Sequence, residues 1–400
     1  MNSSLEDTTM ITGDGSYIKQ INRGLILREI YKNKAISRAS LASITGLNKA
    51  TVSVQVADLL RESLITEYEL PHNTVGRKPI MLSINRKAGY VLGIDLDYKQ
   101  IQFMIADING HPVFSESISL DNETYPDIVQ LLIDYIQKAQ RKWSHAYYGL
   151  ISVVIGVHGT VGNDQQINFV PKHQWHHKKL KDALEKQVNI QVVIENNANL
   201  SAYAEKVYKH HDSQNLVAII LTSGIGSGMM INGHLQKGFH GFAGEMGHMI
   251  IAPDGKECRC GNHGCWELYA SESSLIDQLS KQMHDPNLTA NKIIELIKQS
   301  DQQVLLAVEN LIYYLSIGLN NIINLYNPET LIITSEILKA YPNAISKIKK
   351  NLTSSVSQYR DIFISDLSHT STTMGACALA IQHFSNVPQF ILPDHSHHIE

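Results

Sequence analysis

Four side chains that can bind a transition metal lie close together in the second half of the chain. They are His248, Cys258, Cys260 and Cys265. Three thiolates and an imidazole suit tetrahedral zinc, and four protein ligands leave no open position, so the pattern predicts one structural zinc per chain. Gly255, Gly261 and Gly264 supply the turns that compact ligation needs. The alternative is a chance cluster of reduced thiols beside one of 19 histidines.

A glycine-rich segment at residues 223–228 (SGIGSG) is a second place where chemistry could occur. The backbone N–H groups of such a turn can bind a phosphate group. A tight hairpin between the two flanking apolar strands explains the same glycines equally well. The segment alone therefore does not indicate nucleotide binding.

The composition indicates a soluble protein with more than one domain. The chain has 400 residues, 43% of them hydrophobic and 18% charged, whereas a single domain usually has about 100 to 200 residues. The N-terminus lacks the pattern of a signal peptide, and the apolar runs near residues 150 and 220 are too short for a membrane span. We therefore expect a cytoplasmic protein without a membrane partner. Cys377, outside the metal motif, is expected to lie buried in a helix.

Charge divides the chain into two parts. The formal net charge of −4 combines +4 for residues 1–90 with −8 for the remainder. A basic N-terminal part favours an anionic partner, nucleic acid first, although a solvated basic helix would carry the same charge.

The basic part has the pattern of a helix-turn-helix unit. Residues 22–32 form an amphipathic helix pattern, Ser37 can cap a short second helix that ends at Gly46, and Asn48 can cap a third. The predicted buried stripe of the third helix consists of Val52, Val56, Leu59 and Leu60. This arrangement of short helices is typical of DNA-binding domains.

Side chains on the opposite face of the third helix can reach base edges and phosphates in a major groove. They are Lys49, Thr51, Ser53 and Gln55. Two strand patterns follow, joined by a turn at residues 71–76, and Arg77 and Lys78 at the tip of this wing can contact phosphate or a minor groove. Residues 16–88 therefore predict a winged helix-turn-helix domain that binds DNA. A solvated helix face, or a protein partner such as a sugar-transport component, remains the alternative.

Residues 89–390 predict an α/β body of two similar halves. Apolar strand patterns begin at Tyr90, and a strand ending in the sequence ENNAN continues into a helix. Later helices are expected at residues 269–284, 290–299, 301–325 and 374–384, with a late strand at TLIITSEI. Residues 1–15 and 391–400 are expected to be disordered.

The order of three motifs resembles a known family. ENNAN, then GEMGH, then C-R-C-G-x-x-G-C-x-E look like the ROK group of sugar kinases and sugar-responsive repressors, and the resemblance covers nearly the whole chain. It implies a winged head followed by two actin-like (ribonuclease H-like) lobes with a zinc loop. It also implies a sugar bound between the lobes by Asn196, Asn197, Glu245, His248 and Glu267. His248 would contact zinc through one ring nitrogen and sugar through the other.

Three departures from the kinases of this family predict that the body has no catalytic activity and binds no ATP. Asn197 stands where those kinases carry a catalytic Asp, and an amide cannot accept the proton of the attacking hydroxyl. Asp97 and Tyr98 replace glycines of their D-x-G-G-T turn, which binds phosphate. Residues 334–336 (TSE) replace a further glycine-rich turn.

These observations together predict a homodimeric transcriptional repressor that binds an inverted-repeat operator, with a tetramer as the alternative assembly. Within the family, the overall resemblance is greatest to the xylose repressors, which implies D-xylose as inducer. Xylopyranose lacks the hydroxymethyl group that the kinases phosphorylate, so loss of the base is compatible with a pentose. A sensor of glucose or another hexose, and an active ATP-dependent sugar kinase with an accessory head, are the alternatives.

Overall fold

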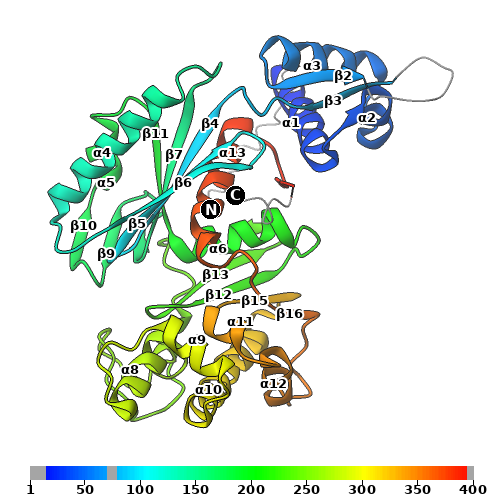
Figure 1. Cartoon of the computed structure of the whole chain (residues 1–400). Helices are drawn as coiled ribbons and strands as arrows, with labels where there is room; N and C mark the ends of the chain where they lie inside the picture. The colour runs from blue at the N-terminus through cyan, green and yellow to red at the C-terminus, as the bar shows by residue number, and fades with distance from the viewer. Residues whose placement is uncertain (1–14, 70–78, 394–400) are drawn as a thin grey trace, which may run out of the picture.

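The chain forms an α/β protein in which a small N-terminal unit, the head, projects from a larger two-lobed body (Figure 1). The computed structural model describes residues 15–69 and 79–393. No helix within these ranges is both long enough and apolar enough to cross a lipid bilayer. The alternation of apolar strands and helices in the sequence thus gives the expected fold class.

The two chain ends predicted to be disordered lie mostly outside the described ranges. The first helix already begins at Gly15. Leu392 is completely buried, and its backbone N–H donates to the carbonyl of Val207 over 3.0 Å. The prediction of a disordered tail from residue 391 is therefore wrong for its first residues, because burial of this apolar side chain stabilises an ordered chain end.

The head consists of three helices and a three-stranded antiparallel sheet. Ser37 and Asn48 cap the second and third helices as predicted, and their side chains accept hydrogen bonds from the backbone of Ser40 (3.1 Å) and Thr51 (2.8 Å). Gly46 adopts φ +71°, which ends the second helix. The elements are α1 (Gly15–Asn33), α2 (Arg38–Thr45), α3 (Lys49–Arg61), β1 (Ile36–Ser37), β2 (Ile65–Glu69) and β3 (Ile80–Ile84), with β3 central.

The head and the body share one continuous hydrophobic core. The Tyr31 hydroxyl donates to the carbonyl of Ile108 over 2.9 Å, and its ring meets that of Phe390 edge to face at 5.1 Å. The Tyr148 hydroxyl donates to the carbonyl of Glu62 over 2.8 Å. The boundary predicted between residues 88 and 89 therefore marks a change of secondary structure within continuous packing.

The first lobe is built on a five-stranded mixed sheet of order β11-β7-β4-β5-β6. Its strands are β4 (Tyr90–Leu96), β5 (Gln100–Asp107), β6 (Pro112–Ser119), β7 (Leu150–Val157) and β11 (Gln191–Asn196). Helices α4 (Tyr125–Lys142) and α5 (Leu180–Glu185) cover its outer face (Figure 1). A small sheet of β8 (Thr160–Val161), β9 (Ile167–Val170) and β10 (Trp175–Lys178) extends from it.

The second lobe has a five-stranded sheet of order β14-β13-β12-β15-β16. Its strands are β12 (Leu216–Leu221), β13 (Ile225–Ile231), β14 (His234–Leu235), β15 (Thr330–Thr334) and β16 (Asp361–Ile364). Its helices are α7 (Glu267–Ala270), α8 (Glu272–Met283), α9 (Ala290–Lys298), α10 (Gln302–Tyr326), α11 (Glu336–Ala340) and α12 (Ala344–Asn351). When each sheet is numbered along the chain, both have the order 3-2-1-4-5, with two antiparallel pairs followed by two parallel ones. The two predicted halves are therefore alike in topology.

Two helices, α6 (Asn197–Ala204) and α13 (Ser371–Ser385), pack side by side between the two sheets (Figure 1). Glycine makes this close packing possible. A Cβ on Gly375 would lie 1.9 Å from the carbonyl oxygen of Leu200, and one on Gly93 would lie 2.4 Å from that of Thr373. Because α6 begins directly after β11, this packing places its first residues between the lobes.

Candidate metal centre and ligand cleft

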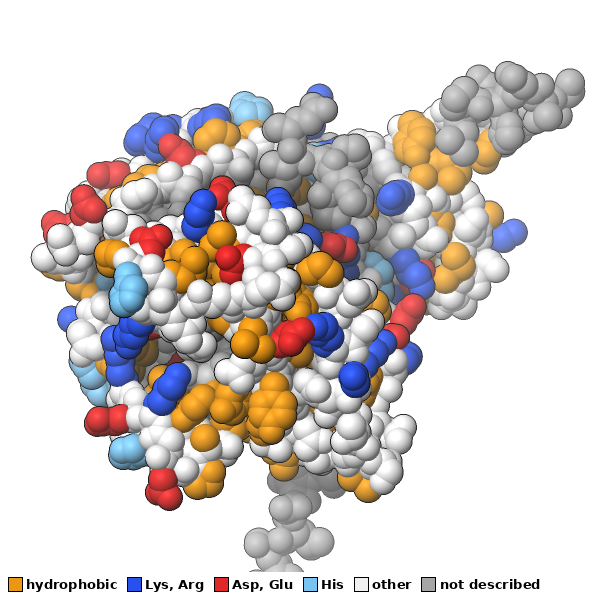
Figure 2. All heavy atoms as spheres, turned by 60° about the horizontal axis from the view of Figure 1, so that its bottom comes forward, with side chains coloured by type: hydrophobic (Ala, Val, Ile, Leu, Met, Phe, Trp, Pro, Cys, Tyr) orange, Lys and Arg blue, Asp and Glu red, His pale blue; other side chains and the backbone are white. Residues whose placement is uncertain are grey.

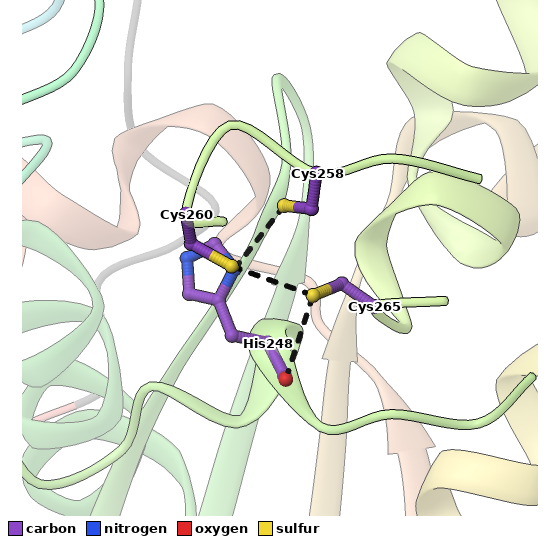
Figure 3. Close-up of side chains that lie close together, drawn as sticks. All are labelled: His248, Cys258, Cys260 and Cys265. Atoms are coloured by element: carbon purple, nitrogen blue, oxygen red, sulfur yellow. Dashed lines mark hydrogen bonds between the residues drawn. The ribbon is translucent and has the colours of Figure 1, made fainter. Parts of the chain in front are cut away.

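The side chains of the predicted metal motif converge on one point. His248 ends a short 3-10 helix (Met246–His248), and the three cysteines follow on the next loop. Their ligand atoms all lie within 4.8 Å of one another, and Figure 3 shows the three sulfur atoms beside the imidazole ring. The Cys258 Sγ to His248 Nδ1 and the Cys260 Sγ to Cys265 Sγ distances are both 3.6 Å. Such spacing matches four ligands around one tetrahedral metal ion.

Tight turns bring these ligands together, as their glycines predicted. Gly261 and Gly264 adopt φ angles of +95° and +79°, which side chains rarely tolerate. A Cβ on Gly264 would also lie 1.8 Å from the carbonyl oxygen of Ala252. The loop can therefore hold this conformation only with glycine at that position.

Two glutamates flank His248, the imidazole of the Cys3His cluster. Its Nε2 lies 3.9 Å from a carboxylate oxygen of Glu245, and its Nδ1 lies 3.5 Å from one of Glu267. The Cys258 thiol contacts the same Glu267 oxygen at 3.3 Å. The Nδ1 side of the ring thus faces the metal centre, and Nε2 faces Glu245, whose side chain is 45% exposed. Three of the five residues expected to bind sugar are therefore neighbours.

Asn196 and Asn197 stand where β11 meets α6, but their side chains have different surroundings. Asn196 caps α6: its oxygen accepts from Ala198 N (2.8 Å) and Asn199 N (3.1 Å), and its nitrogen donates to the Gly159 carbonyl (2.9 Å). Both ends of this side chain are thus engaged within the protein. This differs from the expectation that Asn196 grips a ligand, because the helix terminus offers N–H groups that need an acceptor.

The side chain of Asn197 faces an ionic cluster at the carboxyl ends of β4 and β7. Its nitrogen lies 3.5 Å from His158 Nδ1, and His158 Nε2 lies 2.8 Å from a carboxylate oxygen of Asp95. Asp97 approaches Nδ1 at 3.6 Å. Burial opposes protonation of His158, but the charge and hydrogen bond of Asp95 and the charge of Asp97 raise its pKa to about 9. Sequence reasoning missed this histidine, although it directly follows the largely apolar strand β7.

The β12–β13 hairpin contacts both α6, which begins at Asn197, and Glu267 beside the Cys3His cluster. A Cβ on Gly226 would lie 3.2 Å from the Cβ of Ala198, whereas one on Gly224 would lie 2.6 Å from a carboxylate oxygen of Glu267. A Cβ on Gly247 would lie 2.3 Å from the Ile225 carbonyl oxygen. The glycine-rich segment 223–228 is thus the β12–β13 hairpin, and its glycines allow close packing of protein against protein.

The loop of the second lobe at residues 237–239 contacts the first lobe. Lys237 forms an ion pair with the buried carboxylate of Glu195, and the Asn163 side chain donates to the carbonyls of Gly238 (3.3 Å) and Phe239 (2.9 Å). An adjoining pocket of about 360 Å³ is lined by Gly162, Asn163, Asp164, Gln166, Ile167, Asn168, His177, Phe239, His240 and Phe242. These contacts join the two lobes.

The residues expected to contact DNA are only partly on one surface. Lys49 and Ser53 are exposed on α3 and Thr51 is half-buried, as that expectation requires. The prediction for Gln55 is wrong: it is 3% exposed, and its amide donates to the Lys19 carbonyl over 3.3 Å, because α1 packs on that side of α3. Arg77, Lys78 and the wing turn at residues 71–76 lie outside the described residues. Two exposed apolar side chains, Ile44 of α2 (55%) and Val54 of α3 (57%), were not anticipated.

Together these features define a two-lobed α/β protein with polar side chains between its lobes, a Cys3His cluster able to bind a metal ion, and an N-terminal head whose described residues form three helices and a small sheet. The chain belongs to the ROK family, whose family model matches residues 91–383. This confirms the resemblance found in the ENNAN, GEMGH and cysteine motifs.

The relatives and solved structures differ in how much of this chain they match. The xylose repressor of Bacillus subtilis (strain 168) is 39% identical over 383 residues, which cover 94% of this chain and 98% of that protein. The crystal structure of a ROK family transcriptional regulator, a homologue of the E. coli MLC protein, covers 92% of this chain at TM-score 0.79 and 25% identity, and 97% of that chain is matched. A ROK family glucokinase from Streptomyces griseus, solved with glucose and AMPPNP, is matched over 100% of its length but covers only 74% of this chain, at TM-score 0.65 and 25% identity.

Proposed function

We propose that this protein is a transcriptional repressor that binds operator DNA through its head and releases the DNA when D-xylose binds between the lobes. One observation carries the proposal: the similarity to a xylose repressor extends over 94% of the chain, head included, whereas a kinase of the family matches 74%. The three helices and three-stranded sheet among the described residues of the head support our assignment of this part as a winged helix-turn-helix domain.

The proposed sugar site comprises Asn197, Glu245, His248 and Glu267, with Asn196 shaping the turn. Carboxylates accept hydrogen bonds from sugar hydroxyls, and an amide can both donate and accept. His248 Nε2 faces the exposed Glu245, so the ring can contact a ligand on that side while Nδ1 faces the thiols. A ligand there would contact groups from both lobes, which gives binding a physical route to lobe closure.

We further propose that the Cys3His cluster binds zinc with a structural role. The donor set and its spacing fit a soft divalent ion with four ligands. In this site the metal would fix the loop that carries His248 and precedes Glu267. It would thereby position two sugar-binding side chains without taking part in a reaction.

Catalysis is not part of the proposal. Asn197 cannot act as a base, and the carboxylate of Asp95 is paired with His158 at 2.8 Å. The competing function is ATP-dependent sugar phosphorylation, as in the kinases of the family. ATP consumption measured with D-xylose and D-glucose should remain at background if the repressor function is correct.

The proposed DNA-contacting residues are Lys49, Thr51 and Ser53 on α3, together with Arg77 and Lys78. A homodimer would place two heads on the half-sites of an inverted repeat. Apolar side chains are interspersed with charged ones on the face of the second lobe that Figure 2 brings forward. Leu306, Tyr313 and Leu325 of α10 are 69%, 56% and 70% exposed, and such side chains suit a subunit interface.

Fluorescence anisotropy with labelled DNA from upstream of neighbouring pentose genes tests the function directly. The wild-type protein should bind this DNA, and D-xylose should release it. Glu245→Gln should bind DNA normally but require at least about tenfold more xylose, because an acceptor of charge-assisted hydrogen bonds is lost. Lys49→Ala should weaken DNA binding with unchanged xylose affinity.

Three results would contradict the proposal in different ways. DNA binding that D-xylose does not change, but D-glucose does, would replace the pentose by a hexose. Sugar-dependent ATP consumption would favour the kinase. Equal DNA affinity of the wild type and Lys49→Ala, with no dependence on salt, would remove α3 from the DNA interface.

A further inference from the structure

His158 lies outside the residues proposed above to touch sugar, yet it is the charged neighbour of one of them. The imidazole is 21% exposed and lies between Asp95 on β4 and Asp97 just beyond it, with Asn197 at the start of α6 on its Nδ1 side. Two segments that are distant from His158 in the sequence thus converge on this ring.

The groups that face His158 keep it charged near neutral pH. Burial works against the charge, but the attraction of Asp95, its hydrogen bond and the attraction of Asp97 prevail, so the pKa of His158 is about 9. His173, from the segment before β10, also interacts with this ring, and burial lowers the pKa of His173. At pH 7.5 His158 is therefore an imidazolium beside a largely neutral histidine.

The charge on His158 decides which end of the Asn197 amide can face it. A neutral imidazole that donates from Nε2 to Asp95 has a free acceptor at Nδ1, which suits the Asn197 NH2 group 3.5 Å away. An imidazolium donates from both nitrogens, so of the two ends of the amide only the oxygen can accept from Nδ1, where it competes with the Asp97 carboxylate 3.6 Å away. A half-turn of the amide group exchanges the two arrangements, and in the charged state the NH2 group points away from His158.

A sugar needs the second arrangement. When Glu245 and Glu267 are ionised, their carboxylates can only accept hydrogen bonds, so the sugar hydroxyls that bind them act as donors. The oxygens of these hydroxyls then still require a hydrogen-bond donor from the protein. The Asn197 NH2 group supplies such a donor when it is turned away from the imidazolium. We infer that His158 is a positioning residue that holds Asn197 as a hydrogen-bond donor toward the bound sugar.

This inference rests on the proposed sugar site and predicts a pH dependence with a definite sign. As pH rises through about 9, His158 loses its proton, Nδ1 becomes an acceptor, and Asn197 turns its NH2 group back. Sugar affinity should then fall by about three- to tenfold, the usual effect of one lost hydrogen bond. Binding in this window should also be accompanied by proton uptake.

Calorimetric titration of the full-length protein with D-xylose from pH 7.5 to 10 measures this dependence. The wild type should show the fall, whereas His158→Gln should bind more weakly at pH 7.5 and show no fall around pH 9. Asp97→Asn removes one of the two charges and should move the midpoint to lower pH. His234→Gln, an exposed histidine on β14, should keep the wild-type profile.

A second measurement does not require a sugar. Nuclear magnetic resonance of selectively ¹⁵N-asparagine-labelled protein should show the Asn197 side-chain NH2 signals shifting with a midpoint near the pKa of His158, and no such shift in His158→Gln. Static NH2 signals, or an equal shift in both proteins, would overturn the positioning role. A wild type whose NH2 signals titrate but which binds no D-xylose would instead defeat the proposed function and leave the link between His158 and Asn197 established.

Discussion

The carboxyl group of Glu205 is among the most deeply buried polar groups of the described chain. The residue begins a π-helical turn (Glu205–Lys209) that continues α6, and it is 0% exposed. The Ser365 hydroxyl at the end of β16 donates to one of its oxygens, and His210 Nε2 lies 3.6 Å from the other. Burial is the largest influence and raises the pKa of Glu205 to about 7, against the hydrogen bond from Ser365. An interruption of helical geometry thus coincides with a carboxyl group that is costly to ionise.

This burial predicts how stability depends on pH. Glu205 ionises near its ordinary pKa of 4.5 in the unfolded chain but only near 7 in the folded protein, so stability should decline as pH rises between these values. Glu205→Gln should remove this contribution and be more stable than the wild type at pH 8 by about 1–3 kcal/mol. Urea unfolding at pH 5 and pH 8 measures the difference. The exposed Glu295→Gln should behave like wild type, and an unstable Glu205→Gln at pH 8 would contradict the argument.

At the scale of elements, the loop that carries the cysteines has little regular structure of its own. Its backbone is joined by isolated contacts, such as Ile251 N to the Gly264 carbonyl (2.9 Å) and Cys258 N to the Asn262 carbonyl (2.8 Å). Trp266, which follows, is completely buried and donates to the Tyr314 carbonyl over 2.9 Å. The loop is thus fixed at its end by Trp266, and metal binding at the Cys3His cluster is proposed to fix its middle.

Metal analysis of the purified protein should therefore find about one zinc per chain. Cys260→Ser should lose the metal and weaken D-xylose binding, since His248 and Glu267 would no longer be fixed by the loop. Inductively coupled plasma mass spectrometry and calorimetry measure both effects. Cys377→Ala, a buried cysteine of α13 outside the cluster, should retain the zinc. Native protein that binds xylose but contains no metal would refute this account of the loop.

At the scale of the whole molecule, α13 links the neighbourhood of the cleft to the head. Near its start, Thr372 lies against Gly156 of β7, where an added Cβ would be 2.6 Å from the Thr372 methyl group. Just beyond its end, Pro388 packs on Gly24 of α1, and Phe390 packs on Tyr31. An adjoining groove of about 760 Å³ lies between α1 and the end of α13. Helix α13 and the residues just after it thus contact the first lobe at one end and the head at the other. A movement of the lobes could therefore be transmitted through α13 to the head, and the groove leaves room for it.

Weakening the contact between Phe390 and Tyr31 should therefore uncouple sugar binding in the body from DNA binding by the head. Phe390→Ala removes the ring against Tyr31, so operator affinity should fall or become insensitive to sugar, while D-xylose affinity should stay within about twofold because the cleft is untouched. Anisotropy and calorimetry on the same preparations measure the two affinities. Phe114→Ala, on the partly exposed strand β6, is the matched control. Unchanged release of DNA by xylose in Phe390→Ala would exclude this contact from the coupling.

The sequence by itself determined features that depend on neighbours along the chain. The Cys3His cluster that could bind a metal follows from residue type and spacing, and the caps at Ser37 and Asn48 follow from short polar side chains placed before helical patterns. Most helices of the second lobe were predicted for the same reason. Helix α4 was missed, although Thr124 and Asp127 form a capping box at its start.

Only the tertiary structure decided how distant segments meet. Gln55 is buried because α1 packs over it, and the Asn196 side chain caps the N-terminus of α6. Leu392 is buried against the body. His158 became charged because the fold places Asp95 beside it, 63 residues away in the sequence. Burial and ion pairing depend on which side chains the packed lobes bring together, and local sequence patterns do not contain that information.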